Sequence, residues 1–346
     1  MFLQKLFILN FFLCFVIYFI NLKYRYQISK KLKILDTPDN ERKLHKGSTP
    51  LNGALWFVIA ILLFLIESFL FENFINHQYR LIIITTLLIY IVGFIDDRKS
   101  INPNVRLFIY FFIFYLTVSL DKNFQLKLVY FESLNLEINT SIFATFFSAF
   151  CLAAFVNSIN LVDGINALAN SILAIILFFI FFSYEQKYFL LIILLFFLTL
   201  NSFMIYKQKF FLGDSGALAI STFAGMHLIY LYNLQYKGIN NNLLSSEDIF
   251  VLMAFPGLDM IRVFFERLIN GKNPFKPSRE HLHHFLIKKH SLLLTLIIYI
   301  SFAFTPVMSN FIFQDFYYTS YNLIACIILY IVLLKYSRNK LSLIHI

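Results

Sequence analysis

Two adjacent carboxylates end one of the apolar stretches in this sequence. Asp96 and Asp97 close the stretch, and Arg98 and Lys99 come directly after them. The carboxyl end of a helix disfavours each anion by about 0.3–1 kcal/mol, so a nearby cation must compensate. Arg98 and Lys99 could do so as a structural cap. The acid pair could instead bind a divalent cation or accept a proton.

A second polar group closes another apolar stretch at three-residue intervals. Asn157, Asn160 and Asp163 share one stripe of a helix, because three residues come close to a turn of about 3.6 residues. Amides join helices within membranes, which is one interpretation of the stripe. Their oxygens also suit Mg²⁺, which takes one or two carboxylates from a protein and keeps several waters.

Two glycines flank Asp214 and Ser215 where a further apolar stretch begins. Either residue could cap the helix. The amino end of a helix also attracts phosphate, and glycines allow the backbone to approach it closely.

Histidines are concentrated in one late loop, which contains Arg279, His281, His283 and His284. No cysteine accompanies them and their spacing fits no familiar zinc helix, so we expect a pocket for a phosphorylated, hydroxyl-rich ligand. Just before this loop, Asp259 and Arg262 have the i,i+3 spacing of an ion pair. An early loop carries Lys43 and His45 among charges of both signs, either as a solvated loop or as donors to phosphate oxygens.

The elements that position these residues are membrane spans. Of the 346 residues, 59% are hydrophobic and 14% are charged, against about 25% charged in a soluble domain. This excludes a soluble globule and a disordered chain, and three cysteines are too few for a disulfide scaffold. We predict an all-α polytopic membrane protein with about eleven transmembrane helices. They lie at about 3–22, 51–71, 80–95, 106–120, 140–158, 166–183, 188–206, 216–234, 248–262, 291–307 and 320–335.

The basic residues predict how the spans are oriented. Of the 29 Lys and Arg residues, 23 fall in alternate loops, at 23–50, 96–106, 157–166, 207–216, 262–290 and 335–346. This predicts an outside N-terminus and a cytoplasmic C-terminus, and it explains the net charge of +10 better than nucleic-acid binding does. All the polar clusters lie on the cytoplasmic side. We therefore expect a single membrane-embedded domain, 1–346, with catalytic loops on that face and a short hairpin within 124–139 outside.

Taken together and in this order, the clusters resemble the polyprenyl-phosphate N-acetylhexosamine-1-phosphate transferases of glycosyl transferase family 4, from Asp36 to Leu286. The resemblance implies Mg²⁺-dependent transfer, with Mn²⁺ as a substitute. The sugar phosphate would pass from a UDP-N-acetylhexosamine, by default UDP-GlcNAc, to undecaprenyl phosphate, releasing UMP. This reaction would start surface-polysaccharide or O-antigen synthesis at the bacterial inner membrane, with the active site facing the cytoplasm. A homodimer is compatible with it.

The resemblance also implies residue roles. It gives catalytic roles to Asp96, Asp97 and Asp163, and metal binding to Asp214 and Asn160. It gives substrate binding to Lys43, His45, Asn157, Arg279, His281, His283 and His284.

Some positions depart from the family pattern. Asn166 and Ala167 stand where the family commonly has Asp-Gly, and Ser278 stands where an acid often precedes the arginine. Alternatives are an inactive homologue, the phospho-N-acetylmuramoyl-pentapeptide transferase of peptidoglycan synthesis, and a secondary transporter. Transporters place their polar sites near the bilayer midplane in repeated halves, whereas these acids lie at span ends.

Overall fold

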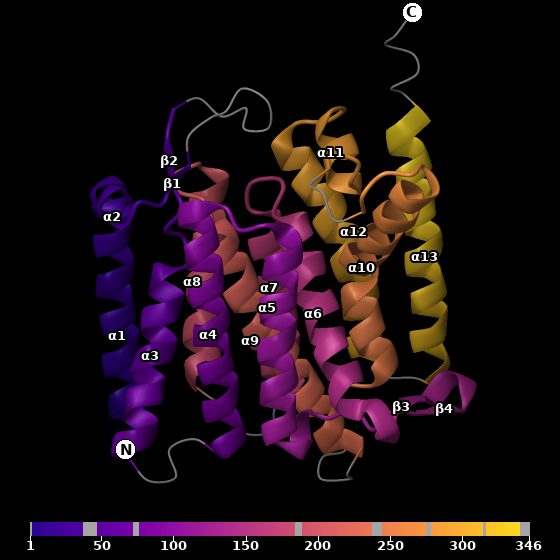
Figure 1. Ribbon diagram of the computed structural model, residues 1–346, viewed down its shortest axis with the longest axis horizontal. Helices are drawn as coiled ribbons and strands as arrows, with labels where there is room; N and C mark the ends of the chain where they lie inside the picture. Colours follow the sequence, from indigo (N-terminus) through magenta and orange to yellow (C-terminus); the bar gives the residue numbers. More distant parts are fainter. Residues whose placement is uncertain are drawn as a thin grey trace, which may run out of the picture.

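The computed structural model describes residues 2–36, 47–71, 76–183, 189–236, 244–274, 278–313 and 316–339. Long helices run side by side through the molecule (Figure 1). They are α1 (Phe2–Lys23), α3 (Leu55–Leu70), α4 (His77–Lys99), α5 (Pro103–Leu120), α6 (Ala144–Val162), α7 (Leu168–Ser183), α8 (Phe189–Tyr206), α9 (Gly213–Tyr236), α10 (Ser246–Ile269), α12 (Leu292–Phe313) and α13 (Phe316–Asn339). Two short helices, α2 (Arg25–Leu32) and α11 (Leu282–Ile287), lie at one end of the bundle (Figure 1).

Each span predicted from the sequence overlaps one long helix. Within the described residues, eight helical segments are long and apolar enough to cross a membrane, and α3 and α7 are shorter apolar helices of 16 residues each. The helical, multi-pass membrane class is therefore confirmed. The short helices α2 and α11 were not predicted, and both form inside loops assigned to the basic side.

Helix α9 lies at the centre of the bundle. Most of Gly213–Leu234 is buried, and α4, α6 and α7 pack against it. Two of its hydroxyl groups are satisfied within the helix, since Ser221 donates to Ala217 C=O and Thr222 donates to Leu218 C=O. This is what a dry interior requires of polar side chains. The amino end of α9, which carries Asp214, is thus held firmly between its neighbours.

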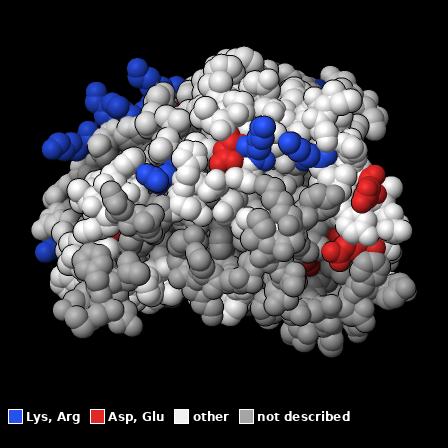
Figure 2. All heavy atoms as spheres, turned by 90° about the horizontal axis from the view of Figure 1, so that it is seen from below, with Lys and Arg blue, Asp and Glu red and all other residues white. Residues whose placement is uncertain are grey.

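The two ends of the bundle differ in what they carry. One end holds α2, α11 and a short antiparallel pair of strands, β1 (Leu35–Asp36) and β2 (Thr49–Pro50) (Figure 1). The other end holds the antiparallel hairpin of β3 (Leu128–Phe131) and β4 (Leu136–Asn139). The hairpin expected within 124–139 is therefore present. Seen from this end, acidic side chains gather at one edge of the surface (Figure 2).

The hairpin is fixed to the start of α10. Ser133 donates both its N–H and its hydroxyl to Glu247 Oε1, at 3.0 and 2.9 Å. Ser245 caps α10, and Asp248 completes a capping box with it. This end of the bundle is thereby closed by hydrogen bonds that involve none of the predicted site residues.

Candidate active site

The guanidinium of Arg106 joins residues from three other helices. It donates to Asp96, its Nη1 lies 3.0 Å from Asp214 Oδ1, and its Nη2 donates to Asn160 Oδ1 at 3.0 Å. Asn160 in turn donates its amide N–H to Asp214 Oδ1 at 2.6 Å. Helices α4, α5, α6 and α9 thus bring four side chains into one network. We call Asp96, Arg106, Asn160 and Asp214 the Arg106 cluster.

Arg106 reaches this cluster because α5 begins just before it. Asn102 caps α5 through its side chain, and Pro103 occupies the first helical position, where its missing N–H costs nothing. On the other side of the turn, Ser100 adopts a left-handed φ of 46° and donates its N–H to Asp96 C=O at 2.8 Å. The connection between α4 and α5 therefore fixes Asp96 and Arg106 relative to each other.

The cation that pairs with Asp96 is Arg106, whereas Asp97 accepts two backbone N–H groups of α9. Arg98 and Lys99, which the sequence offered as a structural cap, are both exposed. Within the described part of the chain, neither forms an ion pair with Asp96 or Asp97. The local capping interpretation is therefore wrong, because the turn after Lys99 brings a cation from the next helix instead.

Asp97 caps α9 from a neighbouring helix. Its Oδ1 accepts the N–H of Asp214 at 2.8 Å, and its Oδ2 accepts the N–H of Ser215 at 3.0 Å. The capping acceptor is thus neither Asp214 nor Ser215. Gly213 has a φ of 76°, and a Cβ atom there would lie 2.8 Å from Asp97 Oδ2, so glycine suits both the backbone and the contact.

Asn157 lies one turn before Asn160 on α6 and outside the Arg106 cluster. Its Oδ1 accepts the hydroxyl hydrogen of Tyr110 at 3.2 Å, and its Nδ2 lies 3.5 Å from Met260 Sδ. It therefore joins α5, α6 and α10, as a helix-bonding amide does. The stripe of three polar residues is divided between two environments.

Asp163 and the histidine loop meet at Gly164. A Cβ atom at Gly164 would lie 2.5 Å from His283 Nε2 and 2.9 Å from His284 Cε1, so the two loops are in direct contact. Burial, followed by the charges of Asp214 and Asp97, raises the pKa of Asp163 well above its usual range. The carboxyl group of Asp163 therefore lies close enough to Asp214 and Asp97 to interact with their charges.

Burial lowers the pKa of two histidines in the histidine loop, His283 and His284. His283 is fully buried, and neither of its ring nitrogens has a hydrogen-bond partner in the described part of the structure. Burial and the neighbouring His284 lower the pKa of His283 well below its usual range. Burial and the charges of His281 and Arg279 lower the pKa of His284 to about 4. Two polar nitrogens without partners at 0% exposure mark His283 as a side chain that a ligand could satisfy.

The backbone at Ala167 shows why glycine suits this position. Ala167 has a φ of 70°, a left-handed conformation that costs a residue with a Cβ atom roughly 1–2 kcal/mol. Glycine adopts it without that cost. The glycine that the family commonly has at this position therefore has a backbone reason, and Ala167 adopts the same turn with strain.

The remaining predicted residues are in the histidine loop and in the early basic loop. Arg279 is exposed beside the histidine loop. Lys43 and His45 lie outside the described residues, so their expected contact with substrate stays a prediction.

The oxygen donors fit a hard divalent cation. In the described residues, no group of three or more His, Cys, Asp and Glu side chains is arranged to hold a metal ion. Mg²⁺ needs fewer, because one or two carboxylates and several waters suffice. The Asp214 side chain is 36% exposed and uses Oδ1 in the Arg106 cluster. Burial is the main cause of the raised pKa of Asp163, and repulsion by Asp214 and Asp97 adds to it; a nearby cation would relieve that repulsion.

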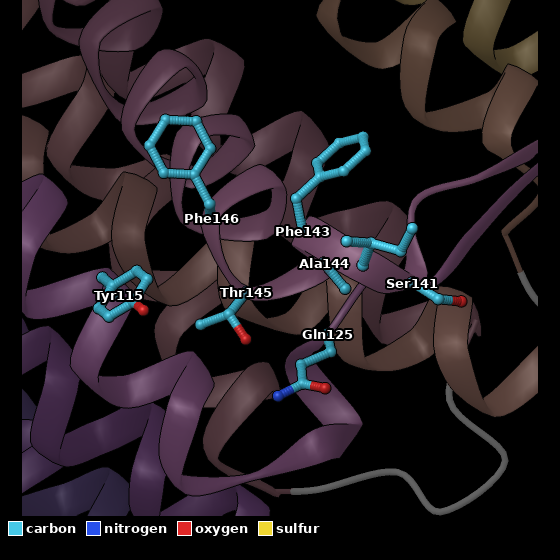
Figure 3. Close-up of a pocket in the computed structure, with 8 residues that line it drawn as sticks. Tyr115, Gln125, Ser141, Phe143, Ala144, Thr145 and Phe146 are labelled. Atoms are coloured by element: carbon cyan, nitrogen blue, oxygen red, sulfur yellow. The ribbon is translucent and has the colours of Figure 1, made fainter.

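A pocket at the opposite end of α5 and α6 does not have this chemistry. It has a volume of about 320 Å³ and is lined by Tyr115, Gln125, Ser141, Ile142, Phe143, Ala144, Thr145 and Phe146 (Figure 3). None of these side chains is a carboxylate, an imidazole or a cation. The lining could not hold two phosphorylated reactants.

Two functional candidates were missed or underestimated. Arg106 was counted only as a topology signal, although its place in the first turn of a helix ten residues after the acids could have indicated it. Asp259 was taken as the partner of Arg262 alone. The ion pair is present, with Arg262 Nη2 at 2.8 Å from Asp259 Oδ1, but Asp259 also binds the histidine loop.

Comparisons with known proteins show which family the sequence resembles. Residues 79–232 match the model of glycosyl transferase family 4. A protein of Escherichia coli K12 named undecaprenyl-phosphate alpha-N-acetylglucosaminyl 1-phosphate transferase is 25% identical over 275 residues, covering 76% of this chain and 71% of the relative. Proteins of the same name from Salmonella typhi and Haemophilus influenzae are 27% identical over 272 residues and 25% identical over 299 residues. They cover 76% and 81% of this chain, and 71% and 79% of the relatives. The resemblance to this family is confirmed.

Proposed function

We propose that this glycosyl-1-phosphate transferase, similar to glycosyl transferase family 4, moves N-acetylhexosamine-1-phosphate from a UDP-sugar to undecaprenyl phosphate and releases UMP. UDP-GlcNAc is the default donor, and the product would start surface-polysaccharide synthesis. The names of the relatives support the acceptor and the sugar. The assignment rests on one observation: Arg106 binds Asn160 and acids from two helices, and Gly164, four residues after Asn160, contacts the histidine loop.

The electrostatics of the cluster suit two anionic reactants. A lipid phosphate and a pyrophosphate repel each other, so the site must supply positive charge and oriented donors. Arg106 can donate in a bidentate geometry, and the imidazole nitrogens of His283 have no partner among the described residues. Asp96 and Asp214 hold Arg106 in place, and Asp97 holds the start of α9.

Asp214 and Asn160 would hold Mg²⁺ in this proposal. When bound, Mg²⁺ would neutralise charge on the pyrophosphate. Asn160 has a carbonyl oxygen to offer, and Asp214 has a partly exposed carboxylate. Mn²⁺ takes similar oxygen ligands and could replace it.

The transfer proceeds by direct attack. An oxygen of the lipid phosphate forms a bond to the β-phosphorus of the UDP-sugar. The bond from that phosphorus to the bridging oxygen breaks, and its electron pair leaves with UMP. Asp96 and Arg106 position the lipid phosphate, while Asp163 and the histidine loop receive the nucleotide sugar. Trapping a phosphorylated protein without the lipid acceptor would overturn direct attack in favour of a covalent intermediate.

UMP release tests the function. Purified protein should release UMP from UDP-GlcNAc only when undecaprenyl phosphate and Mg²⁺ are both present. Asp214→Asn should abolish the release. Asp121→Asn is the matched control, because Asp121 caps a turn at the other end of α5. Release without the lipid, or full activity of Asp214→Asn, would contradict the proposal. UDP-N-acetylmuramoyl-pentapeptide in the same assay tests the peptidoglycan alternative.

We also propose that the cluster faces the cytoplasm of an inner-membrane protein. The excess of Lys and Arg in the loops at this end supports that orientation. In intact cells, a membrane-impermeant maleimide should label Lys127→Cys and leave Lys99→Cys unlabelled until the membrane is opened. Labelling of Lys99→Cys in intact cells would reverse the orientation. A homodimer stays a prediction that cross-linking in membranes can test.

A further inference from the structure

Asp259 holds the histidine loop at several points at once. Its carboxylate is 1% exposed, and it accepts from His281 Nδ1 at 2.8 Å and from the N–H of Leu282 at 3.1 Å. The hydroxyl of Tyr330 donates to it at 2.8 Å, and Arg262 donates at 2.8 Å. Asp259 therefore connects α10 to α13 and to the first residues of α11.

Each described group that hydrogen-bonds to this carboxylate can donate to it. Surroundings made only of donors require an ionised carboxylate, because the hydrogen of a protonated one would point at another donor. The proton shared with His281 must then sit on Nδ1 of the ring. Arg262 supports this arrangement because it also donates to Tyr330 Oη at 2.7 Å and to the C=O of Glu280.

The fixed tautomer has a consequence for the loop. With Nδ1–H directed at Asp259, the other nitrogen of His281 is the one left for a ligand. The ring of His281 lies parallel to that of His283, with 5.6 Å between centroids, and His283 lies against Gly164. The orientation of the His281 ring therefore affects how His283 packs against Gly164, the residue after Asp163.

We infer that Asp259 is a positioning residue. It fixes the Nδ1–H tautomer of His281 and the start of α11, so that the histidine loop is preorganised for the nucleotide sugar. This inference rests on the proposed function for its ligand. It predicts an effect on one of the two substrates, because no described contact of Asp259 reaches the Arg106 cluster.

Kinetics of Asp259→Asn separate positioning from general stability. The amide should lower kcat/KM for UDP-GlcNAc by roughly 10–100-fold, the range for losing the partner that orients a histidine, and leave KM for undecaprenyl phosphate unchanged. Glu266→Gln is the matched control. Glu266 lies two turns after Asp259 on α10 and pairs with Arg262 and Arg338. None of its described contacts reaches the histidine loop, so its substitution should leave both parameters unchanged. Wild-type kinetics for Asp259→Asn, or an equal loss for both substrates, would overturn the inference.

A second measurement does not depend on activity. Nitrogen-15 NMR of histidine-labelled wild-type protein, assigned with His281→Gln, should show Nδ1 of His281 protonated. A bare Nδ1 would overturn the inference even if the protein is active. If the wild-type protein releases no UMP from any UDP-sugar, the proposed function fails, and this spectrum still decides whether Asp259 sets the tautomer.

Discussion

Arg106 Nη1 lies 3.0 Å from Asp214 Oδ1, and through this contact the first turn of α5 is tied to the first turn of α9. The same nitrogen donates to Asp96 on α4. One cation thus balances two acids that are far apart in the sequence. Without it, two carboxylates would lie at the end of the bundle uncompensated, which is costly for groups taken out of water.

Arg106→Gln should destabilise the protein and abolish transfer. Removing one partner of a buried ion pair costs about 3 kcal/mol, because the acid left behind stays partly desolvated. Thermal unfolding in detergent measures the loss, and UMP release measures the activity. Arg98→Gln is the control, since Arg98 is an exposed arginine two residues after Asp96. If the two variants unfold at the same temperature, Arg106 is not the compensating cation.

Hydropathy predicted the bundle because each span has to be apolar along its length, whatever it packs against. The hairpin within 124–139 was also predictable, since alternation is a local pattern. The basic loops predicted which connections share an end. Contacts such as Gly164 against His283 agree with that prediction. These features depend on short windows of sequence.

The contacts that assemble the site depend on tertiary packing. In the sequence, Arg106 counts only as a basic loop residue, and Asp259 only as the i,i+3 partner of Arg262. Their further partners, such as Asn160 and His281, come from other segments that pack against them. The same holds for Asp97, which caps a helix that begins 116 residues after it. Helices α2 and α11 were missed because they have eight and six residues, too short for a periodic pattern to stand out.

Mg²⁺ should stabilise the protein against unfolding. A ligand that binds only the folded state at a concentration of 100 Kd adds about 2.7 kcal/mol, so the melting temperature should rise with added MgCl₂ and fall again with EDTA. Asp214→Asn should remove this dependence, because it takes away the partly exposed carboxylate of the cluster. Asp121→Asn should keep it. An equal response to Mg²⁺ in wild type and Asp214→Asn would place the metal elsewhere.

Acid should destabilise the fold through His284. Its pKa is lowered to about 4 in the folded protein and is about 6.5 in an unfolded chain, so the unfolded state binds more protons between these values. Stability is therefore complete above pH 6.5 and is lost as the pH falls towards 4, by about 1 kcal/mol per pH unit. Asp163, with a raised pKa, acts in the opposite direction, so the difference between wild type and a variant is the quantity to measure.

His284→Gln should reduce the loss of melting temperature between pH 7 and pH 5. His77→Gln, at an exposed histidine, should leave it unchanged. The prediction is contradicted if both variants follow the wild-type pH dependence.

Asp97 should matter both for the fold and for the reaction, and two substitutions can separate these roles. Its two oxygens accept two N–H groups at the start of α9, so Asp97→Ala should cost roughly 0.5–2 kcal/mol, as the loss of a helix cap does. Asp97→Asn keeps one acceptor and loses the charge, so it should cost less stability. Asp248→Asn is the matched control, since Asp248 belongs to a capping box at the other end of the bundle. If the charge of Asp97 serves transfer, Asp97→Asn loses UMP release while Asp248→Asn, with a similar melting temperature, retains it. Equal activity in the two variants would reduce Asp97 to a helix cap.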